Sequence, residues 1–132
     1  MKLETREWIK IAEEEVTSAD LLFENEIYRM VCLHSQQAVE KILKALLTEY
    51  DIEFKRTHNI VDLLALLKAQ GLTVNLNHEE AGFLNAIYRS RYPSDAGLIP
   101  RGEPMKEDAS KALALAKRVL TEGKRMLKNR EK

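Results

Sequence analysis

The segment HSQQAVEKILKA, residues 34–45, places polar side chains inside a run that is otherwise suited to burial in a helix. At about 100° per residue, a helix here has one buried stripe. The stripe contains Tyr28, Cys32, Ser35, Val39, Ile42 and Leu46. Gln36 lies on one border of the stripe, and Glu40 follows it one turn later. A buried polar group without a partner costs about 1–3 kcal/mol, so we expect both side chains to have hydrogen-bond partners.

Gln37 points to the far side of the same predicted helix, together with Lys41 and Lys44. In a monomer these three side chains need no explanation beyond contact with solvent. We therefore expect the two adjacent glutamines, Gln36 and Gln37, to have separate roles.

Arg91 follows Ile87 by four residues and Leu84 by seven, so it continues the apolar face of its own helix. A guanidinium directed inward requires a carboxylate, and we predict that Arg91 meets Gln36 and Glu40 as a structural polar cluster. One role for Arg91, which physics alone favours, is a clamp that fastens the following loop to the helix. The other role is phosphate binding at the mouth of that loop.

Other chemistries leave weaker signals. The three histidines lack the spacing of a zinc-binding helix, and no glycine-rich phosphate loop occurs. We therefore expect no metal and no cofactor. His58 follows Thr57, a candidate N-cap, and capping or packing would explain it. Because Lys55 and Arg56 make its neighbourhood basic, a role as an anion ligand stands equally open.

The elements that must position these side chains are all helical. Apolar residues recur at helical spacing in almost every segment, and no run alternates strictly as a strand would. We expect an all-α fold, an antiparallel four-helix up-and-down bundle with an additional short helix. The predicted helices run from about Thr5 to Glu24, from Ile27 to Tyr50, from a Thr57 cap to a stop at Gly71, from a capping box of Asn77 and Glu80, and from Pro104 to Asn129.

Composition and charge narrow the setting. The 132 residues suit one domain, 1–132, and the 21 basic and 21 acidic side chains create no overall field that would attract nucleic acid or a membrane. The single cysteine, Cys32, excludes an intramolecular disulfide and suits a reducing compartment. No apolar run approaches the roughly 18 residues of a membrane span. We expect a soluble, cytoplasmic protein with no membrane partner.

Three motifs occur in order along the chain: HSQQAVEKILKALL, KRTHNIVDLL and SRYPSD. In combination and spacing they resemble the HEPN domain, a family of higher eukaryotes and prokaryotes, over nearly the whole chain. The resemblance implies a helical bundle. By this resemblance, the motif positions are Gln36, Gln37, Glu40, Lys41, His58, Arg91, Tyr92 and Pro93.

Many HEPN proteins cleave RNA or bind nucleotides, and many are paired with a minimal nucleotidyltransferase in toxin–antitoxin modules. The resemblance therefore implies a homodimer and a nucleotidyltransferase partner. One physical feature agrees with a dimer, since His34, Ala38 and Ala45 form a second strip of mostly small residues beside the buried stripe. Coverage of that strip by the fourth and fifth predicted helices is the alternative.

The chain also departs from the family pattern. RNA-cleaving members carry an arginine followed four to six residues later by a histidine, whereas no histidine follows Arg91, and Asp95 stands in that interval. Arg29 and His34 have the spacing, yet they lie about 140° apart on a helix and cannot face one substrate together. Asn59 stands where relatives often have aspartate.

Two functions follow from these residues. The favoured one is a module that binds a nucleotide or an RNA phosphate, with aromatic stacking on a base and charge on the phosphate. Its candidate binding residues are Arg91, Tyr92, His58, Lys55 and Arg56. The alternative is a metal-independent ribonuclease toxin, in which Arg91 stabilises the phosphorane and His58 or Asp95 moves the proton. Whether the chain is an enzyme is left open, with the balance against catalysis.

Overall fold

The computed structural model describes residues 1–90 and 103–131. These residues form five α-helices and no strand, which confirms the predicted all-α bundle. The helices are α1 (Leu3–Glu24), α2 (Tyr28–Glu49), α3 (Ile60–Ala69), α4 (His78–Ser90) and α5 (Lys106–Arg130).

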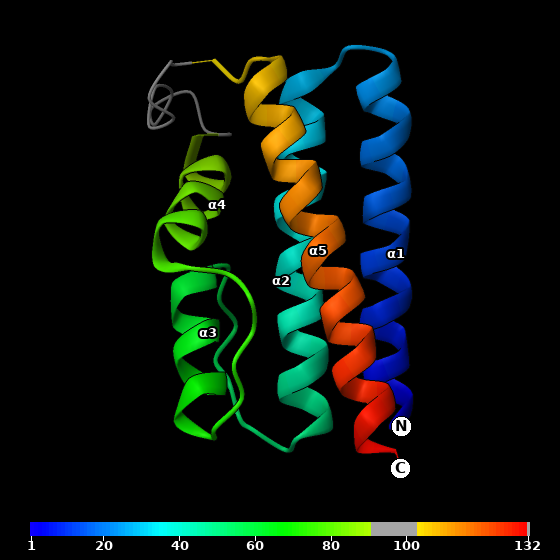
Figure 1. The fold of residues 1–132 in the computed structure, drawn as a ribbon, viewed down its shortest axis with the longest axis vertical. Coiled ribbons are helices and arrows are strands. Elements are labelled where there is room, and N and C mark those ends of the chain that lie inside the picture. The colour runs from blue at the N-terminus through cyan, green and yellow to red at the C-terminus, as the bar shows by residue number, and fades with distance from the viewer. Residues whose placement is uncertain (91–102, 132) are drawn as a thin grey trace.

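The three long helices α1, α2 and α5 pack side by side, and α3 and α4 stack end to end on the remaining side of α2 (Figure 1). Two short helices therefore share the fourth position of the bundle. Of the five, α2 is the central helix, because it contacts all four others.

The core forms around α2, where burial extends far beyond a single stripe. Val31, Ala38, Leu43, Ala45 and Leu47 are fully buried although they lie outside the predicted stripe. Their burial follows from the position of α2, since a helix surrounded by neighbours has no solvent face. The predicted stripe was therefore correct but too narrow, and polar side chains on the other sides of α2 are enclosed as well.

The ends of α1, α2 and α3 share one geometry. The second residue after each helix has a positive φ: 60° at Glu26, 57° at Asp51 and 78° at Gly71. In each case the next amide donates back across the last turn, as Leu72 N does to Leu67 O at 3.0 Å. Gly71 is therefore the helix terminator that the sequence predicted.

The helix starts match the predictions only in part. Asn77 and Glu80 form the predicted capping box, with Asn77 Oδ1 2.7 Å from Glu80 N and Glu80 Oε1 3.0 Å from Asn77 N. The cap at Thr5 was wrong, because Thr5 lies inside α1 and its buried hydroxyl donates to Glu49 Oε1 at 2.9 Å. The cap at Thr57 was wrong as well, since Asn59 Oδ1 accepts from the amide of Asp62.

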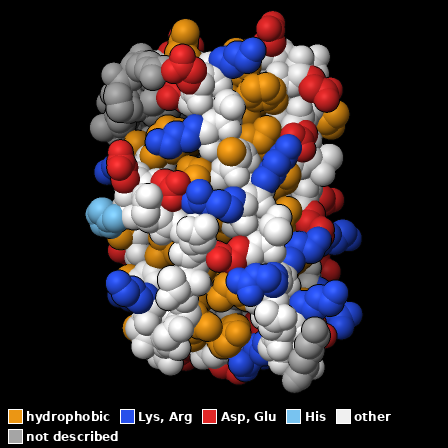
Figure 2. Space-filling view, in the orientation of Figure 1, with side chains coloured by type: hydrophobic (Ala, Val, Ile, Leu, Met, Phe, Trp, Pro, Cys, Tyr) orange, Lys and Arg blue, Asp and Glu red, His pale blue; other side chains and the backbone are white. Residues whose placement is uncertain are grey.

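Charged side chains link the long helices on the face shown in Figure 2, where lysines and arginines over the C-terminal half of α5 alternate with acidic groups. Lys117 Nζ lies 2.7 Å from Asp20 of α1, and Lys124 Nζ lies 2.8 Å from Glu13. These exposed pairs orient α5 against α1 but add little stability. Among the described residues, no helix is long and apolar enough to cross a membrane.

Candidate functional site

The most unusual group in the core is the carboxylate of Glu40, which is fully buried at the middle of α2. Three nitrogens surround it. His58 Nδ1 lies 2.8 Å from Oε1, and Lys44 Nζ and Lys41 Nζ lie 3.0 Å and 3.1 Å from Oε2. Every carboxylate oxygen therefore has a charged or ionisable partner, which is the condition for keeping a buried anion. We call these four residues the Glu40 cluster.

Electrostatics favours the ionised form of Glu40. Burial alone would raise its pKa, but the hydrogen bonds from Lys44 and His58, with the charge of Lys41, outweigh that effect and lower the pKa. The carboxylate is thus an acceptor only, so His58 Nδ1 must be the donor in their contact. In the neutral imidazole Nε2 then carries the lone pair and accepts a hydrogen bond, whereas in the imidazolium Nε2 carries a proton that an anion can accept.

Burial of the two lysines corrects the expectation that they face solvent. The side chain of Lys44 is 6% exposed and that of Lys41 is 19% exposed. The ring of Trp8 covers them from α1, with its centroid 5.6 Å from Lys41 Nζ and 5.7 Å from Lys44 Nζ. Helical geometry gave the correct directions, but α1 occupies the side that was expected to be open.

His58 forms the outer part of the cluster. Its side chain is 43% exposed, and its ring stacks on Tyr88 of α4 with centroids 4.3 Å apart and planes 18° apart. Within the described residues, the only hydrogen-bond partner of the ring is Glu40. The capping role for His58 is thereby replaced by a role in holding the carboxylate, while part of the ring stays accessible.

The two glutamines act together, contrary to the expectation that their roles are separate. Gln37 Nε2 donates to Gln36 Oε1 at 2.6 Å. Gln36 is fully buried one turn before Glu40, and its own Nε2 has no hydrogen-bond partner in the described part of the chain. An amide donor left in this state carries a desolvation cost of about 1–3 kcal/mol.

Several predicted site residues lie elsewhere or outside the described residues. Arg91, Tyr92, Pro93 and Asp95 all fall within 91–102, so the predicted contact of Arg91 with Gln36 and Glu40 stays a prediction. Lys55 and Arg56 line a surface groove that His58 does not line.

Arg29 and His34 of α2 do not face a common site, as the angle between them on the helix predicted. Arg29 Nη2 lies 2.7 Å from Glu103, whereas His34 Nδ1 lies 3.2 Å from Glu15 on α1. The two side chains therefore have separate partners. The physical hint of a dimer also disappears, because Ala38 and Ala45 are fully buried within the single chain.

Metal and thiol chemistry find no support in the described residues, which contain no group of three or more histidine, cysteine or acidic side chains suited to a metal. Cys32 is fully buried, and burial followed by the charge of Asp108 raises its pKa to about 12. Its thiol is therefore held in the unreactive form, as expected for a core residue.

Sequence reasoning missed Trp8 and Tyr88 as parts of the site. Tyr88 had no local signal, because its partner His58 lies far away in the chain and the pairing depends on how α4 docks. Lys44 did carry a signal, since it follows Glu40 by four residues, the spacing of a helical ion pair.

Comparisons with known proteins identify the family and the fold of the chain. The HEPN domain family matches residues 5–127. Among solved structures, the archaeal HEPN homologue ST0689 is 26% identical with a TM-score of 0.62, and the match covers 96% of this chain and 98% of that one. TT1696 from Thermus thermophilus is 23% identical with a TM-score of 0.70, and the match covers 94% of this chain and 98% of that one. No curated protein shows significant similarity.

The family match spans nearly the entire chain and includes α2, α3, α4 and most of α1 and α5. It also includes all four residues of the Glu40 cluster. This protein belongs to the HEPN domain family.

Proposed function

We propose that this HEPN domain binds the phosphate of a nucleotide or of RNA, and that the accessible ring of His58 is the contact point. The observation that carries the proposal is the charge of the Glu40 cluster. One carboxylate is enclosed by two lysines and a histidine, so positive charge exceeds negative charge even before His58 is protonated. A cation excess at a partly enclosed site attracts an anion.

The stacked pair of His58 and Tyr88 supports the same proposal. Together the two rings form an aromatic surface beside a source of positive charge, which is how many proteins hold a base and its phosphate. Arg91 and Tyr92 stay predicted contributors to this surface. Lys55 and Arg56 stay predicted as well, although the acidic lining of their groove makes phosphate a poorer fit there.

Titration of the 15N-labelled protein with inorganic phosphate, AMP and a short single-stranded RNA tests the proposal by NMR. We expect shifts at the His58 ring and Tyr88. His58→Asn should weaken binding at least tenfold, because asparagine can still donate to Glu40 but lacks the second ring nitrogen. The matched control is His78→Asn, which changes an exposed histidine in the first turn of α4.

Binding that is unchanged in His58→Asn, with an unaltered melting temperature, would contradict the proposal. So would equal losses in His58→Asn and His78→Asn, because a general loss of positive charge would then explain them both.

The hydrogen bond between Glu40 and His58 favours a second candidate, a metal-independent ribonuclease. A buried carboxylate that fixes one imidazole nitrogen leaves the other able to accept or donate a proton. The assay is cleavage of a structured RNA in the presence of a chelator. Cleavage that disappears in His58→Asn but persists in His78→Asn would favour the enzyme, and intact RNA with measurable binding would favour the module.

We also infer, from family membership alone, a homodimer that pairs with a minimal nucleotidyltransferase in a toxin–antitoxin system. Sedimentation equilibrium measures the dimer directly. Co-expression with the product of a neighbouring nucleotidyltransferase gene, where one occurs, followed by size-exclusion chromatography, tests the partner. Elution of two separate peaks would count against the pairing.

A further inference from the structure

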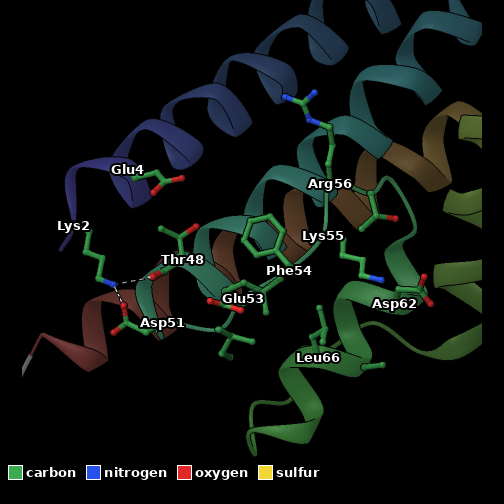
Figure 3. A pocket seen from close by; sticks show the side chains of 14 residues that line it. Lys2, Glu4, Thr48, Asp51, Glu53, Phe54, Lys55, Arg56, Asp62 and Leu66 are labelled. Carbon is green, nitrogen blue, oxygen red and sulfur yellow. Dashed lines mark hydrogen bonds and ion pairs between the residues drawn. The ribbon is translucent and has the colours of Figure 1, made fainter.

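A groove of about 1220 Å³ lies toward the end of the bundle opposite the α1–α2 turn (Figure 3), and it extends to Thr57, the residue before His58. Its walls come from the start of α1, the end of α2, the segment 51–57 and one side of α3. Its apolar floor consists of Leu47, Ile52, Phe54, Ala65 and Leu66. Figure 3 shows the ring of Phe54 at the centre of the groove.

The backbone of residues 53–57 forms one side of this groove, and the segment 53–58 makes no backbone hydrogen bond within the described residues. Within the described residues, no N–H or C=O group of this segment is paired with backbone or side chain. The pairing resumes at Asn59, whose amide donates to Thr57 Oγ1 at 3.1 Å. Figure 1 shows the segment running back beside α3 as a non-helical stretch. A row of free donors and acceptors along a groove is a template for an added strand.

Most of the charged side chains around the groove have no ionic partner within the described residues. Lys2 and Asp51 form an ion pair, but Glu4, Glu53 and Asp62 have no ionic partner in the described chain. Lys55 and Arg56 are unpaired there too. In Figure 3, Glu4 and Glu53 lie on one side of Phe54, and Lys55 and Asp62 lie on the other.

We propose that this groove binds an extended segment of a partner polypeptide, which pairs its backbone with residues 53–58. Apolar side chains of the partner pack over Phe54 and Leu66. A basic side chain at one end faces Glu4 and Glu53. Because the side chains of a strand alternate between its two faces, the basic and apolar residues of the partner occur at every second position.

Other occupants fit the groove less well. The three unpaired acids outnumber the two unpaired cations, so a nucleic-acid backbone would be repelled at the Glu4 and Glu53 end. A small ligand would leave the backbone of residues 53–58 unpaired, whereas an extended chain satisfies backbone, floor and charges together.

The test uses the whole protein and the peptide acetyl-Lys-Thr-Val-Thr-Val-Thr-amide, which places lysine and both valines on one face. In a 15N titration up to about 1 mM peptide, we expect saturable shifts centred on residues 53–58. A peptide of the same sequence with N-methyl groups on the pairing edge should bind at least tenfold more weakly.

A charge swap tests the orientation. Glu53→Lys should weaken the lysine peptide at least fivefold, and a peptide with glutamate in place of lysine should recover the loss. The matched control is Glu7→Lys, an exposed position on α1 that does not line the groove. Absence of shifts at residues 53–58, equal binding of the N-methylated peptide, or similar RNA-induced shifts at residues 53–56, which lie outside the phosphate contact proposed at His58, would each overturn the proposal.

Discussion

The Glu40 cluster shows how one buried charge determines the chemistry of its neighbours. Glu40 lowers the freedom of His58 by fixing its tautomer, and it holds two lysine side chains inside the bundle. Each of these groups would carry a desolvation cost alone, and together they offset it. The site is therefore a unit, and a change at one member affects the others.

The first prediction concerns removal of the buried charge. Glu40→Gln should lower the free energy of unfolding by about 3–5 kcal/mol, because Lys44 and Lys41 keep their charges but lose the carboxylate. Urea denaturation followed by circular dichroism measures this change. The control Glu7→Gln, on the exposed face of α1, should stay within about 0.5 kcal/mol of the parent. Equal effects of the two substitutions would show that Glu40 has no special electrostatic role.

The second prediction is a pH dependence with a defined sign. Because the pKa of Glu40 is lower in the folded protein than its ordinary value of 4.5, the folded state binds fewer protons than the unfolded state below that pH. The stabilisation is complete above about pH 4.5 and is lost as the pH falls through the folded pKa. Unfolding free energy should therefore fall on acidification.

Glu40→Gln should reduce this slope without abolishing it. The remainder belongs to three other carboxylates whose pKa is lowered. Burial raises the pKa of Glu49, but hydrogen bonds from Lys2 and Thr5 lower it by more. Arg118 and Asn77 lower the pKa of Glu80, and Lys2 lowers that of Asp51. Parallel pH profiles for Glu40→Gln and the parent protein would contradict the assignment.

At the residue scale, the sequence predicted that Gln36 and Glu40 need hydrogen-bond partners, but it did not identify most of those partners. The i, i+4 relation between Glu40 and Lys44 and the basic segment before His58 were visible signals. The covering ring of Trp8 was not, since its contact with Lys41 depends on the packing of α1 against α2. The expected partner, Arg91, lies outside the described residues.

Helix packing provides the clearest contrast at the element scale. A Cβ atom placed on Gly123 of α5 would lie 2.5 Å from Ile42 Cγ2 of α2. At Gly82 of α4, in contrast, such a Cβ would meet no neighbouring side chain or element within 4 Å among the described residues. The close approach of α5 to α2 therefore requires glycine at 123, whereas α4 has no such requirement at 82.

We predict opposite signs for two identical substitutions. Gly123→Ala should destabilise the protein by about 1–2 kcal/mol, because the steric clash of the added methyl group with Ile42 outweighs the higher helix propensity of alanine. Gly82→Ala should stabilise it by about 0.5–1 kcal/mol through propensity alone. Thermal unfolding followed by calorimetry measures both. Stabilisation by Gly123→Ala would mean that α5 shifts away from α2 at little cost.

Helix ends were more predictable than helix starts. Gly71 was recognisable because glycine is suited to a positive φ, while Glu26 and Asp51 adopt the same geometry without that signal. The two threonine caps failed for different reasons. Thr5 is recruited by Glu49 of α2, and Thr57 is displaced by Asn59, whose Oδ1 also accepts from Asn85 of α4.

For the whole molecule, the arrangement of helices divides the bundle into two parts that differ in how many neighbouring helices each helix packs against. The long helices α1, α2 and α5 contact one another, while α3 and α4 pack mainly on α2 and on each other. Local stability depends on the number of packed neighbours. The two short helices are therefore the part expected to open first.

Hydrogen exchange measured by NMR tests this expectation. The amides of α3 should exchange at least tenfold faster than those in the middle of α2, because a local opening of α3 and α4 leaves the three long helices packed. Uniform protection across all five helices would show instead that the bundle opens only as one cooperative unit.

The all-α class and the antiparallel order were predictable from helical periodicity and short turns. The end-to-end stacking of α3 and α4 was not, because it depends on how the segments around them dock on α2. The single-domain assignment over 1–132 and the dimer stay predictions.

The position of Trp8 has an optical consequence. It is the only tryptophan in the chain, and its ring covers two lysine ammonium groups while its Nε1 donates to Thr48 Oγ1 at 3.1 Å. Indole emission responds to nearby charge and to the geometry of its N–H bond. The intrinsic fluorescence of the unlabelled protein should therefore report any rearrangement of Lys41 and Lys44, so that an anion reaching the Glu40 cluster produces a spectral change in real time.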